Sequence, residues 1–182
     1  VSAEGPQGSY VVMNNPNGGL DLANIPAGKQ AKAEAVAQAF AVLTNLSIID
    51  VVKDTGKIKF DRTYVGELRD SSVYTLHVAS QGSKHYVKCS AEFRDQSGVF
   101  KKYEVESQEE LKAKEAKLLA RDRAEEFTKR TRGWMYELSE WNAKALTSDF
   151  TDLIENEPKK KPGAEPYDPN KTMPYDPKKK YE

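Results

Sequence analysis

Residues 72–93 read SVYTLHVASQGSKHYVKCSAEF, and this stretch decides the fold because two runs of alternating apolar residues flank a glycine-containing turn. With Gln81-Gly82 at the tip, the pattern predicts a β-hairpin whose register is set by the turn. A slip by one residue would turn half of the apolar set toward water, so the buried face is strongly specified. The expected opposed pairs are Val78 with His85, Leu76 with Val87, and Tyr74 with Cys89. The expected apolar face carries Tyr74, Leu76, Val78, Val87, Cys89 and Ala91.

Further regular segments are expected before this hairpin. Residues 10–13 and 20–22 flank an Asn- and Gly-rich turn, which predicts a second hairpin. Residues 29–46 are expected to form an amphipathic helix, because large apolar side chains recur every three or four positions. Residues 48–52 and 57–68 are predicted strands. The helix stripe consists of Val36, Phe40, Leu43 and Leu46.

A long charged helix is expected after the hairpin, over about residues 107–130. Ser107 and Glu110 have the spacing of a capping box, and Gly133 is expected to stop the helix. The apolar stripe is alanine-rich, which favours packing along the protein's own sheet and leaves a coiled-coil arm as the alternative. This stripe is Ala113, Ala116, Ala120, Ala124 and Phe127, flanked by Leu111, Leu118 and Leu119.

The remaining segments complete the predicted architecture. Residues 134–138 alternate as a short strand, and Ser139 is expected to cap a helix that carries Trp141, Ala145 and Leu146. The elements together predict an α+β domain, in which an antiparallel sheet of hairpins is packed by one amphipathic helix and the long charged helix. We expect this domain to span residues 1–155, followed by an extended tail rich in proline, tyrosine and lysine over 156–182.

The composition argues against several classes of protein. The chain has 182 residues, with 28 Lys and Arg against 28 Asp and Glu, and this balance argues against a general nucleic-acid binder. The single cysteine excludes an internal disulfide. No apolar run approaches the ~20 residues that a membrane span needs. Because the first residue is Val1, any signal peptide or anchor would lie outside this sequence.

For each residue that could take part in catalysis or bind a ligand, we favour a structural role. His77 and His85 are expected on opposite faces of the hairpin, and no further metal-ligand motif joins them. Cys89 is expected to be a buried apolar residue rather than a nucleophile, because no base accompanies it. Gly28 is expected in a turn, because Ala27-Gly28-Lys29 lacks the rest of a phosphate-loop motif. The sequence therefore predicts no catalytic residue, no cofactor and no metal site, and favours a protein that is not an enzyme.

Three aromatic residues lie close together in the sequence. Trp134, Tyr136 and Trp141 could form a stacking site, but the favoured prediction is that they cover a small core.

The tail contains a repeated motif that indicates binding to a protein. Pro-Tyr-Asp-Pro occurs at 166–169 and again at 174–177, in a segment with too few aliphatic side chains to fold alone. The two tyrosines are eight residues apart, or about 25 Å in a polyproline-like chain, and could anchor the tail in two pockets. A flexible solubilising extension is the alternative. The predicted partner-binding residues are Pro166, Tyr167, Pro169, Pro174, Tyr175 and Pro177.

Several short stretches between residues 10 and 154 carry a family resemblance: GLDL at 19–22, IPAGK at 25–29, LTNL at 43–46, YTLHV at 74–78, YVK at 86–88, GWMYEL at 133–138, and Leu153. In these stretches the chain resembles an uncharacterised bacterial family, the domain of unknown function four-three-four-zero. The resemblance implies an α+β domain of helix-plus-hairpin units, located outside the cytoplasm behind a membrane anchor and near components of ABC-type transporters similar to those of gliding motility. It implies no activity and no catalytic residues.

Taken together, these features predict a non-enzymatic interaction or scaffold subunit of a bacterial cell-envelope assembly, tethered to a partner through its tail. The expected partners are proteins of a larger complex, with membrane-associated proteins among the candidates, and not nucleic acid. The expected location is the periplasm or cell envelope, with the cytoplasm as the alternative. The alternative function is a small-molecule or peptide binding domain that uses the sheet face.

Overall fold

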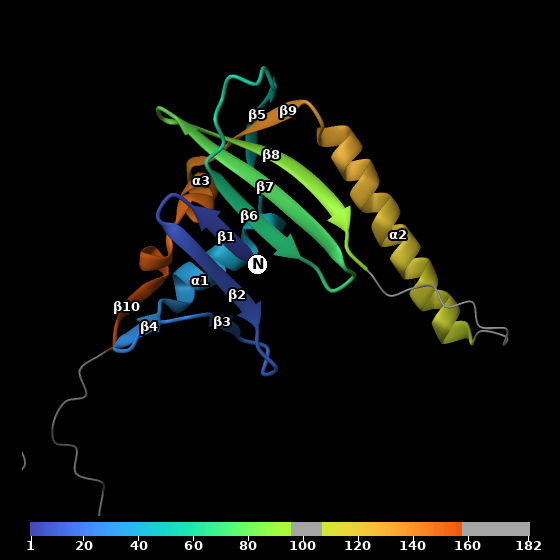
Figure 1. The fold of residues 1–182 in the computed structure, drawn as a ribbon, viewed down its shortest axis with the longest axis horizontal. Helices are drawn as coiled ribbons and strands as arrows, with labels where there is room; N and C mark the ends of the chain where they lie inside the picture. The colour runs from blue at the N-terminus through green and yellow to red at the C-terminus, as the bar shows by residue number, and fades with distance from the viewer. Residues whose placement is uncertain (96–106, 158–182) are drawn as a thin grey trace, which may run out of the picture.

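A computed structural model describes residues 1–95 and 107–157 and shows an α+β fold built on one large antiparallel sheet (Figure 1). Eight strands form this sheet in the order β3-β2-β1-β6-β7-β8-β9-β5, and β10 pairs separately with β4. The strands are β1 Ser2–Gly5, β2 Gly8–Asn14, β3 Leu20–Leu22, β4 Lys29–Ala31, β5 Ile48–Lys53, β6 Arg62–Glu67, β7 Ser72–Gln81, β8 Lys84–Phe93, β9 Trp134–Leu138 and β10 Ile154–Asn156. The helices are α1 Ala33–Ala41, α2 Gln108–Thr131 and α3 Glu140–Thr147, with short 3-10 turns η1 Val42–Thr44 and η2 Phe150–Leu153.

The hairpin of β7 and β8 forms with its predicted apolar face but with a corrected register. Gln81 pairs with Lys84, so the tip is Gly82-Ser83, one residue later than predicted. Every predicted pair therefore shifts by two residues, and Val78 lies opposite Val87. Gly82 has a φ of 63°, and glycine is favoured at the first central position of a type II′ turn for this reason. A shift of two preserves the side of the sheet to which each residue points, which is why the predicted face is right.

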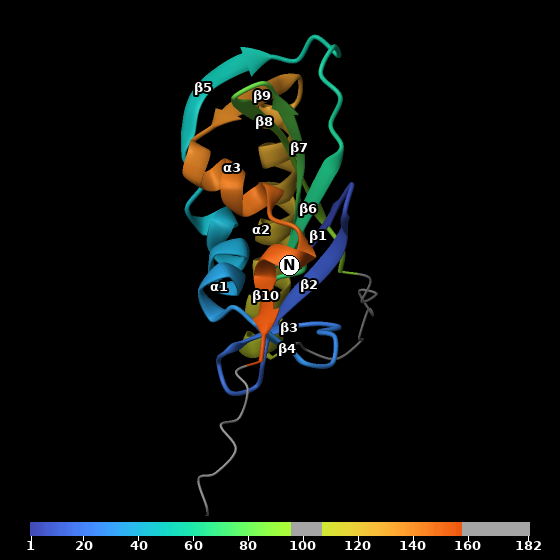
Figure 2. The same ribbon diagram turned by 90° about the vertical axis from the view of Figure 1, so that its left-hand side faces the viewer.

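The main core lies between one face of the sheet and the helices. Figure 2 shows α1 and α3 together on one side of strands β1, β2, β6 and β7. Tyr64 of β6 is fully buried there, and its hydroxyl donates a 2.7 Å hydrogen bond to the backbone oxygen of Ala39 in α1. Other fully or almost fully buried members are Val12, Val36, Val42, Leu76, Val78, Val87, Leu146 and Leu153.

Helix α1 begins four residues later than predicted. Residues Lys29–Ala31 instead form β4, because they pair with β10 from the opposite end of the chain. The centre of the buried stripe is Val36, Ala39 and Val42, whereas the other three predicted stripe residues are only partly buried. Small side chains at the centre let the helix approach its neighbours closely, and the larger ones flank the contact.

Helix α2 packs on the sheet along only half of its length. The predicted capping box is confirmed: Ser107 Oγ accepts from the Glu110 amide, and the Glu110 carboxylate accepts from the Ser107 amide. In the C-terminal half, Ala120 and Ala124 are buried, and Thr128 Oγ1 bonds both backbone groups of Ala91 in β8 at 2.7 Å. In the N-terminal half the alanines and leucines of the predicted stripe are exposed, so packing along the sheet is confirmed only for the C-terminal half.

Of the next two predicted strands, the first is confirmed and the second is shorter than expected. Residues 48–52 lie in β5, at the end of the sheet, where β5 pairs with β9. Of the predicted 57–68 strand, only Arg62–Glu67 is β6. Upstream of it the chain crosses the outer face of the sheet, where Lys88 forms an ion pair with Asp54 and lies 4.3 Å from the centre of the Phe60 ring. Phe60, one of the alternating apolar residues that the sequence pattern assigned to a longer strand, therefore lies against Lys88 and is not part of β6.

Candidate functional site: a groove between α1 and α3

An open groove of about 800 Å³ lies between α1 and α3. Ligand sites in proteins commonly have volumes of roughly 300–1,000 Å³ and combine apolar surface with a few polar groups. This groove fits that description, because small alanine side chains and one tryptophan alternate with charged groups. The lining residues are Lys32, Ala33, Glu34, Ala35, Gln38, Trp141, Lys144, Ala145, Thr147, Ser148, Asp152 and Glu155.

One wall of the groove is a single face of α3. Trp141, Lys144, Ala145 and Ser148 are spaced by three or four residues, so they lie in one row along the helix. The opposite side of α3 carries Ala143 and Leu146 into the core and therefore fixes the rotation of the helix. Ser139 caps this helix as predicted, with its Oγ accepting from the Asn142 amide. The half-exposed Trp141 ring is thus presented by a helix that is anchored on its other side.

The other wall begins at the N-terminus of α1. Lys32 occupies the cap position and makes no side-chain capping bond. The first-turn residues Ala33, Glu34 and Ala35 line the groove. Uncapped N–H groups and the helix dipole make such a helix start attractive to an acceptor with negative charge. The groove therefore offers donor groups beside the Lys32 ammonium.

Charges of both signs line the groove. Within the described ranges, neither Lys32 nor Lys144 forms an ion pair, and Glu34 has none either. Asp152 instead caps η2, with its carboxylate accepting from the Asp149 amide at 2.9 Å. A ligand that carries both a carboxylate and an amine would find complementary groups on the two walls.

The described part of the chain ends beside this groove. Strand β10 pairs with β4 from Ile154 opposite Ala31 to Asn156 opposite Lys29. Glu155 of β10 lines the groove, and the Glu157 amide donates to the Gly28 backbone oxygen at 3.1 Å. The C-terminal tail therefore starts from a fixed strand next to the Trp141 wall.

The tail residues predicted to bind a partner lie outside the described residues. Their proposed role as anchors consequently stays a prediction. These residues are Pro166, Tyr167, Pro169, Pro174, Tyr175 and Pro177.

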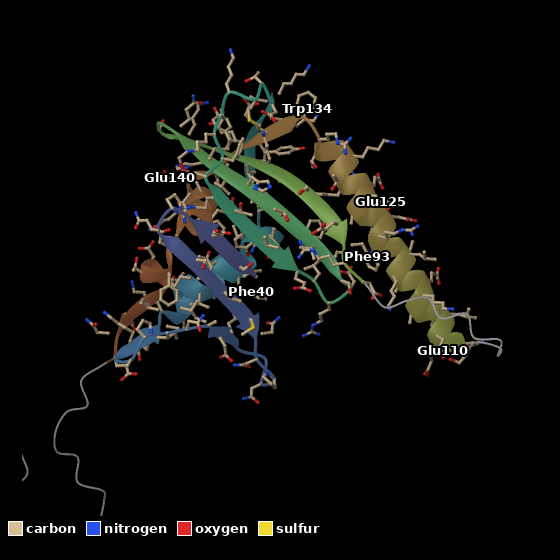
Figure 3. All side chains as sticks on the ribbon, in the orientation of Figure 1. Phe40, Phe93, Glu110, Glu125, Trp134 and Glu140 are labelled. Carbon is tan, nitrogen blue, oxygen red and sulfur yellow. The ribbon has the colours of Figure 1, made fainter. Side chains whose placement is uncertain are left out.

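The three aromatic residues that were expected to cover a small core do not act together. Trp134 and Trp141 are 44% and 50% exposed, so neither ring covers a core, and that prediction is wrong for both. Figure 3 shows Trp134 at one end of β9, well separated from Glu140, which immediately precedes Trp141. Only Tyr136 is packed against the core. The structure thus keeps Trp141 in the groove and separates it from the other tryptophan.

The histidines and the glycine before β4 have structural surroundings. His77 Nδ1 lies 3.2 Å from Thr63 Oγ1, and His85 Nδ1 lies 2.9 Å from Ser80 Oγ, on opposite faces of the hairpin as predicted. In the part of the chain that the structure describes, no three His, Cys, Asp or Glu side chains converge as metal ligands. Gly28 has a φ of 76° and occupies a turn, which confirms its predicted role.

Cys89 lies on the inner face of β8, opposite Leu76 rather than Tyr74. Its side chain is partly buried and packs against the core, and burial raises the pKa of the thiol to about 12. The thiol is therefore protonated at neutral pH, which agrees with the predicted apolar role and not with an activated nucleophile.

Alkaline unfolding should report this burial. The folded-state pKa of Cys89 is raised from 9.0 to about 12, so the unfolded chain loses the thiol proton first, and the stabilisation present below pH 9 is lost as pH rises toward 12. We expect a fall of about 1.4 kcal/mol per pH unit from this group in that window. Replacing Cys89 with alanine should remove that part of the slope in urea unfolding at pH 8, 9.5 and 11. Parallel curves for the two proteins would show that the thiol is not protected from ionising.

One buried polar group, the Tyr10 hydroxyl, was not predicted from the sequence. Tyr10 is 4% exposed, and its hydroxyl has no hydrogen-bond partner among the described residues. It lies near the ion pair between Arg62 Nη1 and Asp149 Oδ1 (2.8 Å), and burial raises the Tyr10 pKa to about 12. Tyr10 and Phe150 border a small cavity of about 150 Å³. The alternating pattern marked Tyr10 as a strand residue but carried no sign of its polar neighbours.

Strand β5, at the edge of the sheet, exposes an apolar surface outside the groove. In the described sheet β5 pairs only with β9, and its Ile48, Ile49 and Val51 are between 45% and 64% exposed. The strand carries an irregularity at Ile49, and Asp50 Oδ1 accepts from the Val51 amide at 2.8 Å. A bulge and a charged side chain on the backbone are devices that protect an edge from pairing with another chain. The edge is thus less open to strand addition than its apolar composition indicates.

The chain matches no family model, no curated protein and no solved structure. Across residues 1–95 and 107–157, no helix has both the length and the apolar character to cross a membrane. The case for function therefore depends on the groove, the charges and the tail of this chain.

Proposed function

We propose that this protein is a non-enzymatic interaction or scaffold subunit, tethered to a protein partner through its C-terminal tail. The observation that carries the proposal is the anchored exit of that tail. Strand β10 is paired with β4, and Leu153 immediately before it is fully buried, so force on the tail is transmitted to the core. A tether needs this combination of a folded body and an extended binding segment.

The sheet itself supports the alternative function less well. Its inner face is covered by α1, α3 and the C-terminal half of α2. The outer face of β7 and β8 carries polar residues such as Thr75 and His77 and is crossed by the segment with Phe60. Its apolar residues Val73, Ala79 and Tyr86 are buried and offer no open apolar surface. A small molecule that needs an apolar cleft would find little room on either face.

The proposed location is the bacterial cell envelope, near an ABC-type transporter. This part rests on the resemblance to the domain of unknown function four-three-four-zero. Fractionation of the source cells with an antibody against the folded domain tests it, and recovery only with cytoplasmic markers would refute the envelope location.

Removal of the tail should abolish partner capture and spare the fold. A chain ending at Glu157 keeps β10 and the bond from the Glu157 amide to Gly28, so its Tm should change by less than about 2 °C. We expect recovery of a specific partner from cell extract to fall at least tenfold relative to the full chain, measured by quantitative mass spectrometry. Equal recovery by the two chains would eliminate the tail as the tether.

The two tyrosines provide a finer comparison. Replacing Tyr167 and Tyr175 with alanine in the full chain should reduce recovery as strongly as truncation, because aromatic anchors dominate binding energy. Replacing Lys159 and Lys160 with alanine is the matched control and should cost much less, because exposed charges contribute little. A larger loss for the lysine variant would point to a purely electrostatic tail.

A further inference from the structure

We propose that the groove between α1 and α3 binds the chain's own C-terminal tail, through one of the two Pro-Tyr-Asp-Pro segments. The inference extends the proposed tether, because it gives the tail a resting place from which a partner must release it, and it rests on the tail being a binding segment. The surface of the groove suits such a segment. Trp141 exposes half of its area, and the small side chains of Ala33 and Ala35 line the same groove. Proline-rich segments dock on grooves lined by aromatic residues, because they lose little entropy on binding.

The charges of the groove and of the tail are complementary. Each motif places one carboxylate, Asp168 or Asp176, beside a tyrosine and between two prolines. The groove presents Lys32, Lys144 and the uncapped start of α1 to a carboxylate. Lysines follow each motif, and Glu34 on the α1 wall is an acceptor for them. Both charge types of the motif therefore have counterparts in the groove.

The tail is long enough to reach the groove of its own molecule. Pro166 is ten residues beyond Asn156, so the intervening chain spans up to about 31 Å in an extended polyproline-like form. Glu155 already lines the groove, so the tail has only to turn back on itself. Because the tail is covalently attached beside the groove, its effective concentration at the groove is on the order of millimolar. The tail of a second molecule would match that only in concentrated solution, so the protein's own tail is favoured.

The two tryptophans make a direct test possible in the full chain. Trp141 and Trp134 have similar exposure, but only Trp141 lines the groove. Their two indole N–H signals can be assigned in ¹H–¹⁵N spectra with a Trp141→Phe variant. Replacing Tyr167 and Tyr175 with alanine should shift the Trp141 signal and leave the Trp134 signal in place. If neither signal moves, or both move equally, the groove is not the binding site.

Dilution decides between the protein's own tail and that of another molecule. The spectrum of the full chain differs from that of the variant in which Tyr167 and Tyr175 are replaced with alanine. This difference should be unchanged over a tenfold dilution, because binding within one chain does not depend on concentration. A difference that disappears on dilution would overturn binding of the protein's own tail and assign the groove to a second copy.

A tail peptide supplied separately measures the affinity. The chain ending at Glu157 retains the whole described core, and a peptide of residues 158–182 should bind it and shift the Trp141 signal. Replacing Trp141 with alanine should weaken this binding at least tenfold, whereas replacing Trp134 with alanine should leave it unchanged. The full chain should bind the peptide several-fold more weakly, because its own tail competes. Absence of binding, or equal binding to both chains, refutes the proposal, and neither result depends on the partner captured by the tail.

Discussion

A free energy of unfolding lower by about 2–5 kcal/mol is the expected result of replacing Leu153 with alanine. Leu153 is fully buried in η2, and its backbone oxygen accepts from the Lys32 amide at 2.8 Å. The substitution removes apolar contacts and leaves a cavity that the neighbouring α1 and β2 cannot fill without moving. Because Leu153 comes just before β10, the point where the tail leaves the domain should loosen as well. Urea unfolding of the two proteins measures the difference.

Leu118 provides the matched control for this substitution. It is 53% exposed on α2, so its replacement with alanine removes little buried surface and improves helix propensity slightly. We expect a change within about 0.5 kcal/mol. If Leu153→Ala costs no more than Leu118→Ala, the C-terminal segment is not part of the core.

The second large effect is expected from replacing Asn142 with alanine, which should destabilise the protein by about 2–4 kcal/mol. Asn142 is fully buried on α3, and its Nδ2 donates to the Asn45 backbone oxygen at 2.9 Å. Its Oδ1 accepts from the Ser47 amide at 2.7 Å and from Ser139 Oγ at 2.8 Å. Removal of the amide leaves backbone groups of the η1–β5 connection without partners. Thermal and urea unfolding measure the loss, and hydrogen exchange should show a less protected Ser47 amide.

Lys144, two residues further along α3, is the control for the helix itself. Its side chain is exposed, so alanine at this position should change the free energy of unfolding by about 0.5 kcal/mol or less. An Asn142→Ala protein as stable as Lys144→Ala would mean that water replaces the amide bonds without cost. That result would remove the amide as the link between α3 and the start of β5.

Local patterns predicted most elements correctly, and the errors have a common cause. The hairpin of β7 and β8, the capping box at Ser107 and the end of α2 at Gly133 depend on residues close in sequence. Strand β4 was assigned to a helix because its pairing partner, β10, lies more than 120 residues away. Strand β1 was missed because its four residues carry little apolar pattern, although pairing with both β2 and β6 stabilises it. Strand pairing across the chain overrides weak local preference.

The groove was only partly accessible from the sequence. Trp141 was recognised as a notable aromatic residue, and Trp141, Lys144 and Ser148 have the spacing of one helix face. Nothing in the sequence brings that face next to Lys32 and Glu34, which are more than 100 residues away. The groove forms because α1 packs against α3, with η2 and β10 completing its lining.

The amino-acid sequence by itself determined the α+β class, the apolar face of the central hairpin, and the caps of α2 and α3. These properties follow from side-chain periodicity and from hydrogen bonds between near neighbours. Only the tertiary structure decided four further features. They are the pairing register of β7 with β8, the formation of strand β4, the half of α2 that is buried, and the groove beside the start of the tail. Each of these depends on which distant segments pack together, because burial and strand pairing are set by contacts that no local pattern records.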